Sequence, residues 1–177
     1  MNKKLLAKIK KIKCLVLDVD GILTDGKIII DHQGHEIKNF DVKDGFGIVF
    51  FKKAGYKTAI ISARSSAAVT ARAQDLQIDK VFQDAHPKID AYKKLLQEWH
   101  LHDEEVCFMG DDLPDMAVLK NAGFAVTVPQ AVSEVKKIVD YVTEHKAGEG
   151  AVREVIELIL KTQGHWKKVL QTYAIHN

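Results

Sequence analysis

The chain is poor in cysteine and has no long apolar run, and each absence excludes a class of protein. Its only cysteines, Cys14 and Cys107, lie in short strand-like apolar runs, so we expect buried reduced thiols and a cytoplasmic protein. No run reaches the length of a bilayer-spanning helix. The 26 basic and 24 acidic residues nearly cancel, so the totals favour neither a nucleic-acid-binding surface nor an acidic tail.

The N-terminus also lacks the features of a secretion signal. Residues 1–13 hold six lysines around four apolar residues, without a continuous apolar core or a small-residue cleavage site. A short amphipathic helix is the simpler interpretation, and its narrow apolar stripe argues against membrane binding. The eight histidines show no metal-ligand spacing, so we expect surface or loop positions for them.

Strands and helices alternate along the chain. We expect one domain over residues 1–177, because 46% apolar residues suffice for one substantial core. Short apolar runs separated by amphipathic segments predict an α/β fold with a doubly wound, Rossmann-like parallel sheet. The predicted strands lie at 14–17, 56–62, 80–84, 106–110, 124–128 and 141–143, and the helices at 45–54, 65–75, 87–99, 114–122, 132–139 and 151–160.

Two segments stand outside this alternation. A protruding hairpin is predicted over residues 27–42, with strands at 27–31 and 36–42, and we expect Asp44 to cap the helix that follows it. The tail at 163–177 has no clear pattern.

Two acids, Asp18 and Asp20, follow the first strand. Gly21 marks a turn there, so the two carboxylates can converge on one small volume. Ionised carboxylates side by side repel, so such a site normally recruits a metal ion or keeps one carboxyl protonated.

Further polar residues follow the other strands, and the carboxyl ends of parallel strands meet in one crevice. The set combines acids for Mg²⁺, a hydroxyl and fixed cations, which together suit a phosphoryl group. These residues are Ser62, Arg64, Lys88, Asp111, Asp112 and Asp115. With Mg²⁺ bridging Asp18, Asp111 and a phosphate oxygen, Asp18 can attack phosphorus and Asp20 can carry the proton.

These motifs, in this order, resemble those of the haloacid dehalogenase superfamily. The resemblance covers Asp18-Val-Asp20-Gly-Ile-Leu-Thr24, Ile61-Ser62-Ala-Arg64, Lys88 and Gly110-Asp111-Asp112-Leu-Pro-Asp115. It implies that Asp18 is the nucleophile and that Asp20 is the acid/base and a metal ligand through its carbonyl. Asp111 would be the third metal ligand, Asp112 and Asp115 would support the metal site, and Ser62 and Lys88 would hold the phosphoryl group.

A closer resemblance, over nearly the whole chain, is to the 3-deoxy-D-manno-octulosonate 8-phosphate phosphatases. It adds the stretches 41–48, 70–72 and 147–154, and it implies a phosphorylated sugar acid of lipopolysaccharide synthesis as the substrate. The expected substrate-binding residues are Thr24, Lys43, Arg64 and Arg72. The chain departs from the family's common residues at Lys43, Ala63, Gln77 and Glu149.

The interval between the first motif and Ser62 is too short for a cap domain, and so is the interval between Ser62 and Lys88. The hairpin is therefore the sole candidate lid. The resemblance implies a homotetramer with sites near subunit interfaces.

Two alternative functions remain open at this point. One is a phosphatase for a sialic-acid-type nine-carbon 9-phosphate, and the other is a signalling receiver, whose phosphoaspartate persists because it lacks an acid/base beside the acceptor.

Overall fold

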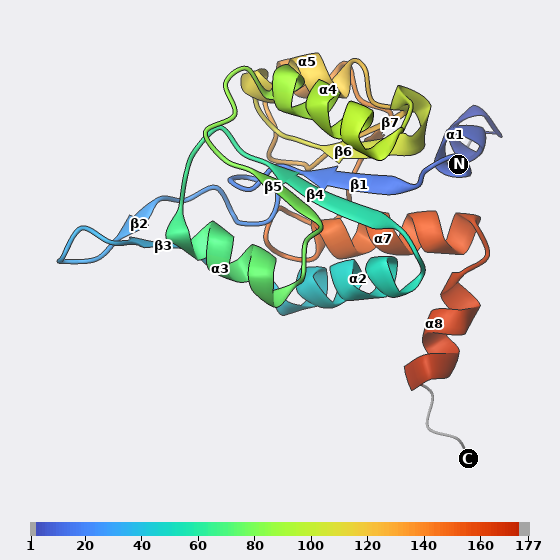
Figure 1. The fold of residues 1–177 in the computed structure, drawn as a ribbon, viewed down its shortest axis with the longest axis horizontal. Coiled ribbons are helices and arrows are strands. Elements are labelled where there is room, and N and C mark those ends of the chain that lie inside the picture. Colours follow the sequence, from blue (N-terminus) through green and yellow to red (C-terminus); the bar gives the residue numbers. More distant parts are fainter. Residues whose placement is uncertain (1–2, 174–177) are drawn as a thin grey trace.

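The computed structural model describes residues 3–173, which are built around a six-stranded parallel sheet (Figure 1). The strand order is β5-β4-β1-β6-β7-β8. Successive strands are added on one side of β1 as far as β5 and then on its other side from β6 to β8, so β1 and β6 flank the switch point. This confirms the doubly wound sheet. The strands are β1 (Cys14–Leu17), β4 (Lys57–Ile61), β5 (Lys80–Phe82), β6 (Val106–Met109), β7 (Phe124–Thr127) and β8 (Tyr141–Val142).

Helices cover both faces of the sheet, with α4 and α5 on one side and α2, α3 and α7 on the other (Figure 1). Every residue of β1 and β6 is buried, which explains their uniformly apolar sequences. The helices are α1 (Lys3–Ile9), α2 (Val42–Lys53), α3 (Ala67–Asp75), α4 (Lys88–Trp99), α5 (Met116–Leu119), α6 (Ser133–Lys136), α7 (Ala151–Thr162) and α8 (Trp166–Tyr173). Short 3₁₀ turns lie at η1 (Asp103–Glu105) and η2 (Leu113–Asp115).

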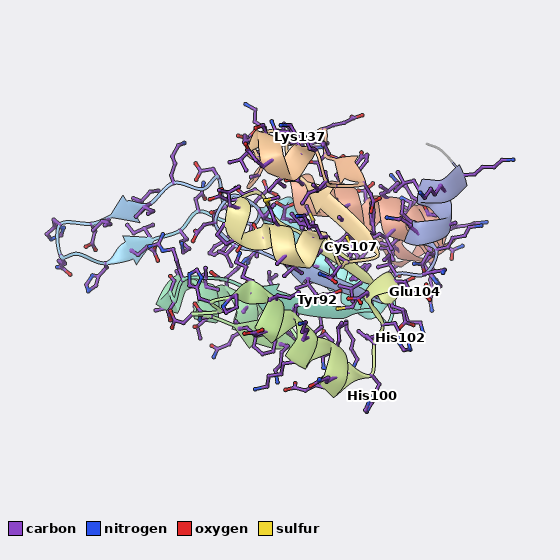
Figure 2. The ribbon with its side chains drawn as sticks, turned by 90° about the horizontal axis from the view of Figure 1, so that it is seen from above. Tyr92, His100, His102, Glu104, Cys107 and Lys137 are labelled. Carbon is purple, nitrogen blue, oxygen red and sulfur yellow. The ribbon has the colours of Figure 1, made fainter. Side chains whose placement is uncertain are left out.

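Both cysteines are buried and unpaired, as predicted. Cys14 opens β1, and Cys107 lies beside it in β6, paired in register with Leu15. Figure 2 shows Cys107 and Tyr92 of α4 in the middle of the molecule, which agrees with their exposed fractions of 0% and 1%. Within residues 3–173, no helix is long and apolar enough to span a membrane.

The predicted hairpin projects away from the body of the molecule in both views (Figures 1 and 2). Its strands, β2 (Ile29–Ile30) and β3 (Glu36–Ile37), are shorter than predicted. They pair only with each other in the described part of the chain, so no neighbouring strand extends the ladder. The hairpin also exposes four isoleucines, at positions 28, 29, 30 and 37.

The prediction that Asp44 caps α2 is wrong. The helix begins earlier, and its cap is Asp41, whose side chain accepts hydrogen bonds from the amides of Lys43 and Asp44. Asp44 instead points at the start of α7, where its Oδ1 accepts the Arg153 amide at 2.7 Å. Its carboxylate is 1% exposed and therefore joins α2 to α7 in the core.

Other element boundaries also differ from the predictions. The helix expected after Pro114 divides into η2 and α5, because Asp112 and Asp115 form a capping box that tightens the first turn. The helix expected at 132–139 is only the four residues of α6. In the tail, α8 packs on α2, with the Phe50 ring 6.2 Å from Trp166 and 5.2 Å from Tyr173. The tail beyond Tyr173 lies outside the described residues.

The buried Asp44 carboxylate predicts a pH-dependent stability. Burial raises its pKa to about 6, against hydrogen bonds from the start of α7. A raised pKa means that the folded state holds the proton more tightly, so this group's stabilising contribution is complete below about pH 4 and is lost as the pH rises through 6. We expect Asp44→Asn to gain stability relative to the native chain across that window, by roughly 1 to 3 kcal/mol.

Chemical denaturation at pH 4, 5, 6 and 7 measures this difference. The matched control is Asp75→Asn, which removes an exposed carboxylate at the end of α3. A constant difference between native chain and Asp44→Asn across the four pH values would contradict the assignment.

Candidate active site

A crevice of about 310 Å³ opens at the carboxyl ends of β1, β4 and β6. This is the edge where a doubly wound sheet binds its ligands, because the loops diverge at the switch point. All of the polar residues predicted from the strand ends line it. The lining residues include Asp18, Asp20, Ser62, Ala63, Arg64, Lys88, Asp111, Asp112 and Asp115.

Lys88 is the central cation of the crevice. It begins α4 and reaches across to two acids, with Nζ 2.7 Å from Asp18 Oδ1 and 2.6 Å from Asp115 Oδ1. Its side chain is 4% exposed, so the pairs are held in a low-dielectric setting. Burial opposes the charge on Lys88, yet Asp18 and Asp115 hold its pKa above the usual range.

Asp115 has no free oxygen, because the carboxylate also holds the loop after β6. Its Oδ2 accepts the amides of Asp111 at 2.9 Å and Asp112 at 3.2 Å, while Oδ1 pairs with Lys88. The role of Asp115 is therefore to shape the loop.

The residues present fit a divalent cation. Carboxylate oxygens of Asp18, Asp111 and Asp115 all lie within 4.8 Å of one another. Asp111 Oδ1 is buried and has no hydrogen-bond partner, which is costly unless a cation balances it. Since both Asp115 oxygens are engaged, Asp18 and Asp111 are the two carboxylates that could hold Mg²⁺, an ion that prefers oxygen ligands.

The pKa values of Asp18 and Asp111 are both raised, because these carboxyls are buried close to other acids. Burial raises the pKa of Asp18 to about 7, Asp115 adds to the rise, and Lys88 opposes it. Burial also raises the pKa of Asp111 to about 7, with Asp115 and Asp112 adding to it. With a pKa near 7 each acid is only partly ionised at neutral pH, and a bound cation would favour the fully ionised form.

Asp20 contacts two basic residues, Lys38 of the hairpin and Arg64 of the loop after β4. Lys38 Nζ lies 2.5 Å from Asp20 Oδ1, and Arg64 Nη1 lies 3.8 Å from Oδ2. Glu36 Oε1 lies 3.2 Å from Lys38 Nζ and 2.8 Å from Arg64 Nη2. Glu36 and Lys38 were not predicted as site residues. Their spacing of two residues was nevertheless a usable signal, because it places both side chains on one face of a predicted strand.

The chain is similar to known proteins over most of its length. Residues 80–156 match a family model described as haloacid dehalogenase-like hydrolase. The 3-deoxy-D-manno-octulosonate 8-phosphate phosphatase of Escherichia coli is 39% identical over 93% of this chain and 87% of its own. The chain belongs to the 3-deoxy-D-manno-octulosonate 8-phosphate phosphatase family. The resemblance inferred from the motifs is thereby confirmed.

Solved structures of the family have the same fold. The Moraxella catarrhalis 3-deoxy-D-manno-octulosonate 8-phosphate phosphatase, solved with magnesium, phosphate and KDO, has a TM-score of 0.96 at 39% identity, covering 98% of this chain and 100% of its own. The Yersinia pestis enzyme has a TM-score of 0.92 at 36% identity, covering 94% and 90%.

Local hydrogen bonds with the backbone fix three further predicted site residues, Ser62, Asp112 and Thr24. Ser62 is buried in the crevice wall, where its Oγ accepts the Arg64 amide at 3.2 Å. Asp112 accepts the Leu113 amide at the start of η2. Thr24 is buried and does not line the crevice, and its hydroxyl donates to the Val19 carbonyl at 3.4 Å and accepts the Gly26 amide at 3.3 Å.

Lys43 and Arg72 do not reach the crevice. Lys43 lines a separate cavity of about 690 Å³ beside α7, together with Glu149. Arg72 pairs with Asp75 at 2.6 Å and lies over the Phe40 ring. A substrate contact by either residue stays a prediction.

One departure from the family's common residues has a physical consequence. Gln77 follows α3 with φ 54°, in the left-handed region where glycine costs least. The glycine commonly found at this position is thus explained by the turn. The structure offers no explanation for Ala63.

The turn at Gly21 predicts a steric test of the site. Gly21 has φ 90°, and a Cβ built there would collide with the Asp111 carboxylate. Gly34, in the hairpin turn, has φ 84° but no atom within 4 Å of such a Cβ. Both alanine variants carry backbone strain of about 1 kcal/mol, and only Gly21→Ala also displaces Asp111.

We therefore expect Gly21→Ala to lower the free energy of unfolding by roughly 1 to 3 kcal/mol more than Gly34→Ala. Equilibrium denaturation of the two variants measures the difference. Equal losses would show that the close approach of Gly21 and Asp111 does not matter.

Proposed function

We propose that this chain is a Mg²⁺-dependent phosphomonoesterase that hydrolyses 3-deoxy-D-manno-octulosonate 8-phosphate to the free sugar acid and phosphate, in lipopolysaccharide precursor synthesis. The observation that supports it most is the buried Asp18–Lys88–Asp115 arrangement beside Asp20 and Asp111, in a chain of this family. Family membership over nearly the whole chain also favours a phosphatase over a signalling receiver.

The chemistry divides between the two acids of the opening motif. A carboxylate oxygen of Asp18 attacks phosphorus, and the bond from phosphorus to the sugar oxygen breaks. Asp20 gives its proton to that leaving oxygen. Asp20 then takes a proton from water, which attacks the aspartyl phosphate, releases phosphate and restores Asp18.

Other side chains reduce the electrostatic cost of this attack. A carboxylate and a phosphate dianion repel, and the buried Lys88 ammonium beside Asp18 offsets that repulsion. Mg²⁺ held by Asp18 and Asp111, with the Asp20 carbonyl, would supply further positive charge to the phosphoryl oxygens. Ser62 would donate a hydrogen bond to the same group, and Arg64 would pair with the sugar-acid carboxylate.

The assembly is a further proposal. We propose that one domain covers the chain, that the hairpin stands in place of a cap domain, and that four copies form a cytoplasmic homotetramer with sites near subunit interfaces. Four exposed isoleucines on a projecting hairpin support an interface, and two buried unpaired cysteines suit a reducing compartment.

The nucleophile assignment predicts the behaviour of Asp18→Asn. An amide cannot form the acyl phosphate, so we expect phosphate release from the 8-phosphate, with Mg²⁺ present, to fall at least about 1,000-fold. Asp25→Asn, in the exposed turn beyond the site, is the matched control and should retain activity. Turnover by Asp18→Asn close to that of the native chain would overturn the assignment.

The substrate assignment has a separate test. Specificity constants for the eight-carbon 8-phosphate and for a sialic-acid-type nine-carbon 9-phosphate are measured side by side. We expect the 8-phosphate to be preferred, and a clear preference for the 9-phosphate would replace the proposed substrate while leaving the reaction class intact.

The assembly proposal predicts a tetramer mass in light scattering at micromolar concentration. Replacing Ile28 and Ile30 by glutamate should dissociate it, because buried charges without partners oppose association. Leu170→Glu, at an exposed position on α8, is the control and should not change the mass. A monomeric native chain would end the proposal.

A further inference from the structure

Four charged side chains form a closed ring at the mouth of the crevice. Lys38 pairs with Asp20 at 2.5 Å and with Glu36 at 3.2 Å. Arg64 pairs with Glu36 at 2.8 Å and with Asp20 at 3.8 Å. Each basic side chain thus lies between two acidic ones, and each acidic side chain lies between two basic ones.

The ring joins three separate parts of the chain. Asp20 lies in the turn after β1, Arg64 lies in the loop after β4, and Glu36 and Lys38 lie in the hairpin. Because β2 and β3 pair only with each other within residues 3–173, side-chain contacts such as these connect the hairpin to the crevice. The hairpin therefore acts on the site through specific charges.

The burial of the ring is uneven. The side chain of Lys38 is 1% exposed, and those of Glu36 and Asp20 are 19% and 23% exposed. Arg64 is 45% exposed and has the longest of the four contacts. Lys38 is thus the fixed member, since a buried ammonium must keep its partners, and Arg64 is the member most open to an incoming anion.

We propose that the hairpin residues Lys38 and Glu36 are positioning residues of the reaction, Lys38 holding the Asp20 carboxyl for proton transfer and Glu36 holding Arg64 for the substrate's carboxylate. The proposal rests on the proposed function and names two residues that complete its site. Proton transfer needs the carboxyl within hydrogen-bond reach of the leaving oxygen, and a group held by one buried contact does not have to be reordered in each turnover.

The Lys38 half predicts a dependence on the leaving group. An alkyl phosphate needs a proton on the departing oxygen, whereas p-nitrophenolate departs readily without one. We expect Lys38→Met to lower kcat for an alkyl phosphate at least 10-fold more than for p-nitrophenyl phosphate. Lys38→Arg should restore most of the difference, because it returns a donor to Asp20.

The controls separate positioning from folding. Lys27→Met removes an exposed lysine at the root of the hairpin, and it should affect both substrates little. Thermal midpoints of all variants are measured, and the ratio of the two kcat values is unaffected by a loss of folded protein. Equal losses on the two substrates, or no rescue by arginine, would overturn the role of Lys38.

The Glu36 half predicts a change in KM. With Arg64 no longer held, Glu36→Gln should raise KM several-fold for a phosphorylated sugar acid and leave KM for p-nitrophenyl phosphate, which has no carboxylate, within twofold. A parallel change for both substrates would overturn it. If the native chain rejects the 8-phosphate, any alkyl phosphate that it does hydrolyse serves in the Lys38 comparison, so a wrong substrate and a wrong ring give different results.

Discussion

The site depends on one buried ammonium, that of Lys88, which lies between two carboxylates. It balances Asp18 at the end of β1 and Asp115 after β6, two acids that would otherwise repel inside the protein. Asp115 in turn accepts the amides of the loop that carries Asp111. One charge balance therefore holds Asp18, the loop that carries Asp111 and the start of α4 in a single arrangement.

When ionised, the three clustered acids Asp18, Asp111 and Asp115 carry more negative charge than Lys88 alone can offset. Asp18 and Asp111 both have a pKa raised to about 7, and Asp111 Oδ1 is buried without a partner. A divalent cation held by Asp18 and Asp111 would offset this excess and would also supply positive charge for the oxygens of a phosphoryl group. The negative charge of these acids thus suits the family's metal, and the charge of that metal suits a phosphorylated substrate.

The core of the fold follows from local sequence, because short apolar runs alternating with amphipathic segments permit few arrangements beyond a right-handed, doubly wound sheet. Predictions failed where a polar side chain had two possible partners. Asp44 has the sequence context of a helix cap, yet Asp41 caps α2 and Asp44 reaches Arg153, which is distant in sequence. Local patterns cannot decide between such partners, because the choice depends on which helix packs nearby.

By itself, the sequence determined which polar residues gather in the crevice, since Asp18, Asp20, Lys88 and Asp111 all lie at strand or helix ends that a parallel sheet must bring to one edge. Only the tertiary structure decided which charges pair. It placed Lys38 and Glu36 of the hairpin on Asp20 and Arg64, and it left Lys43 and Arg72 outside the crevice. The reason is physical: strand ends are positioned by backbone hydrogen bonds, whereas a projecting hairpin is positioned by the side chains that it meets.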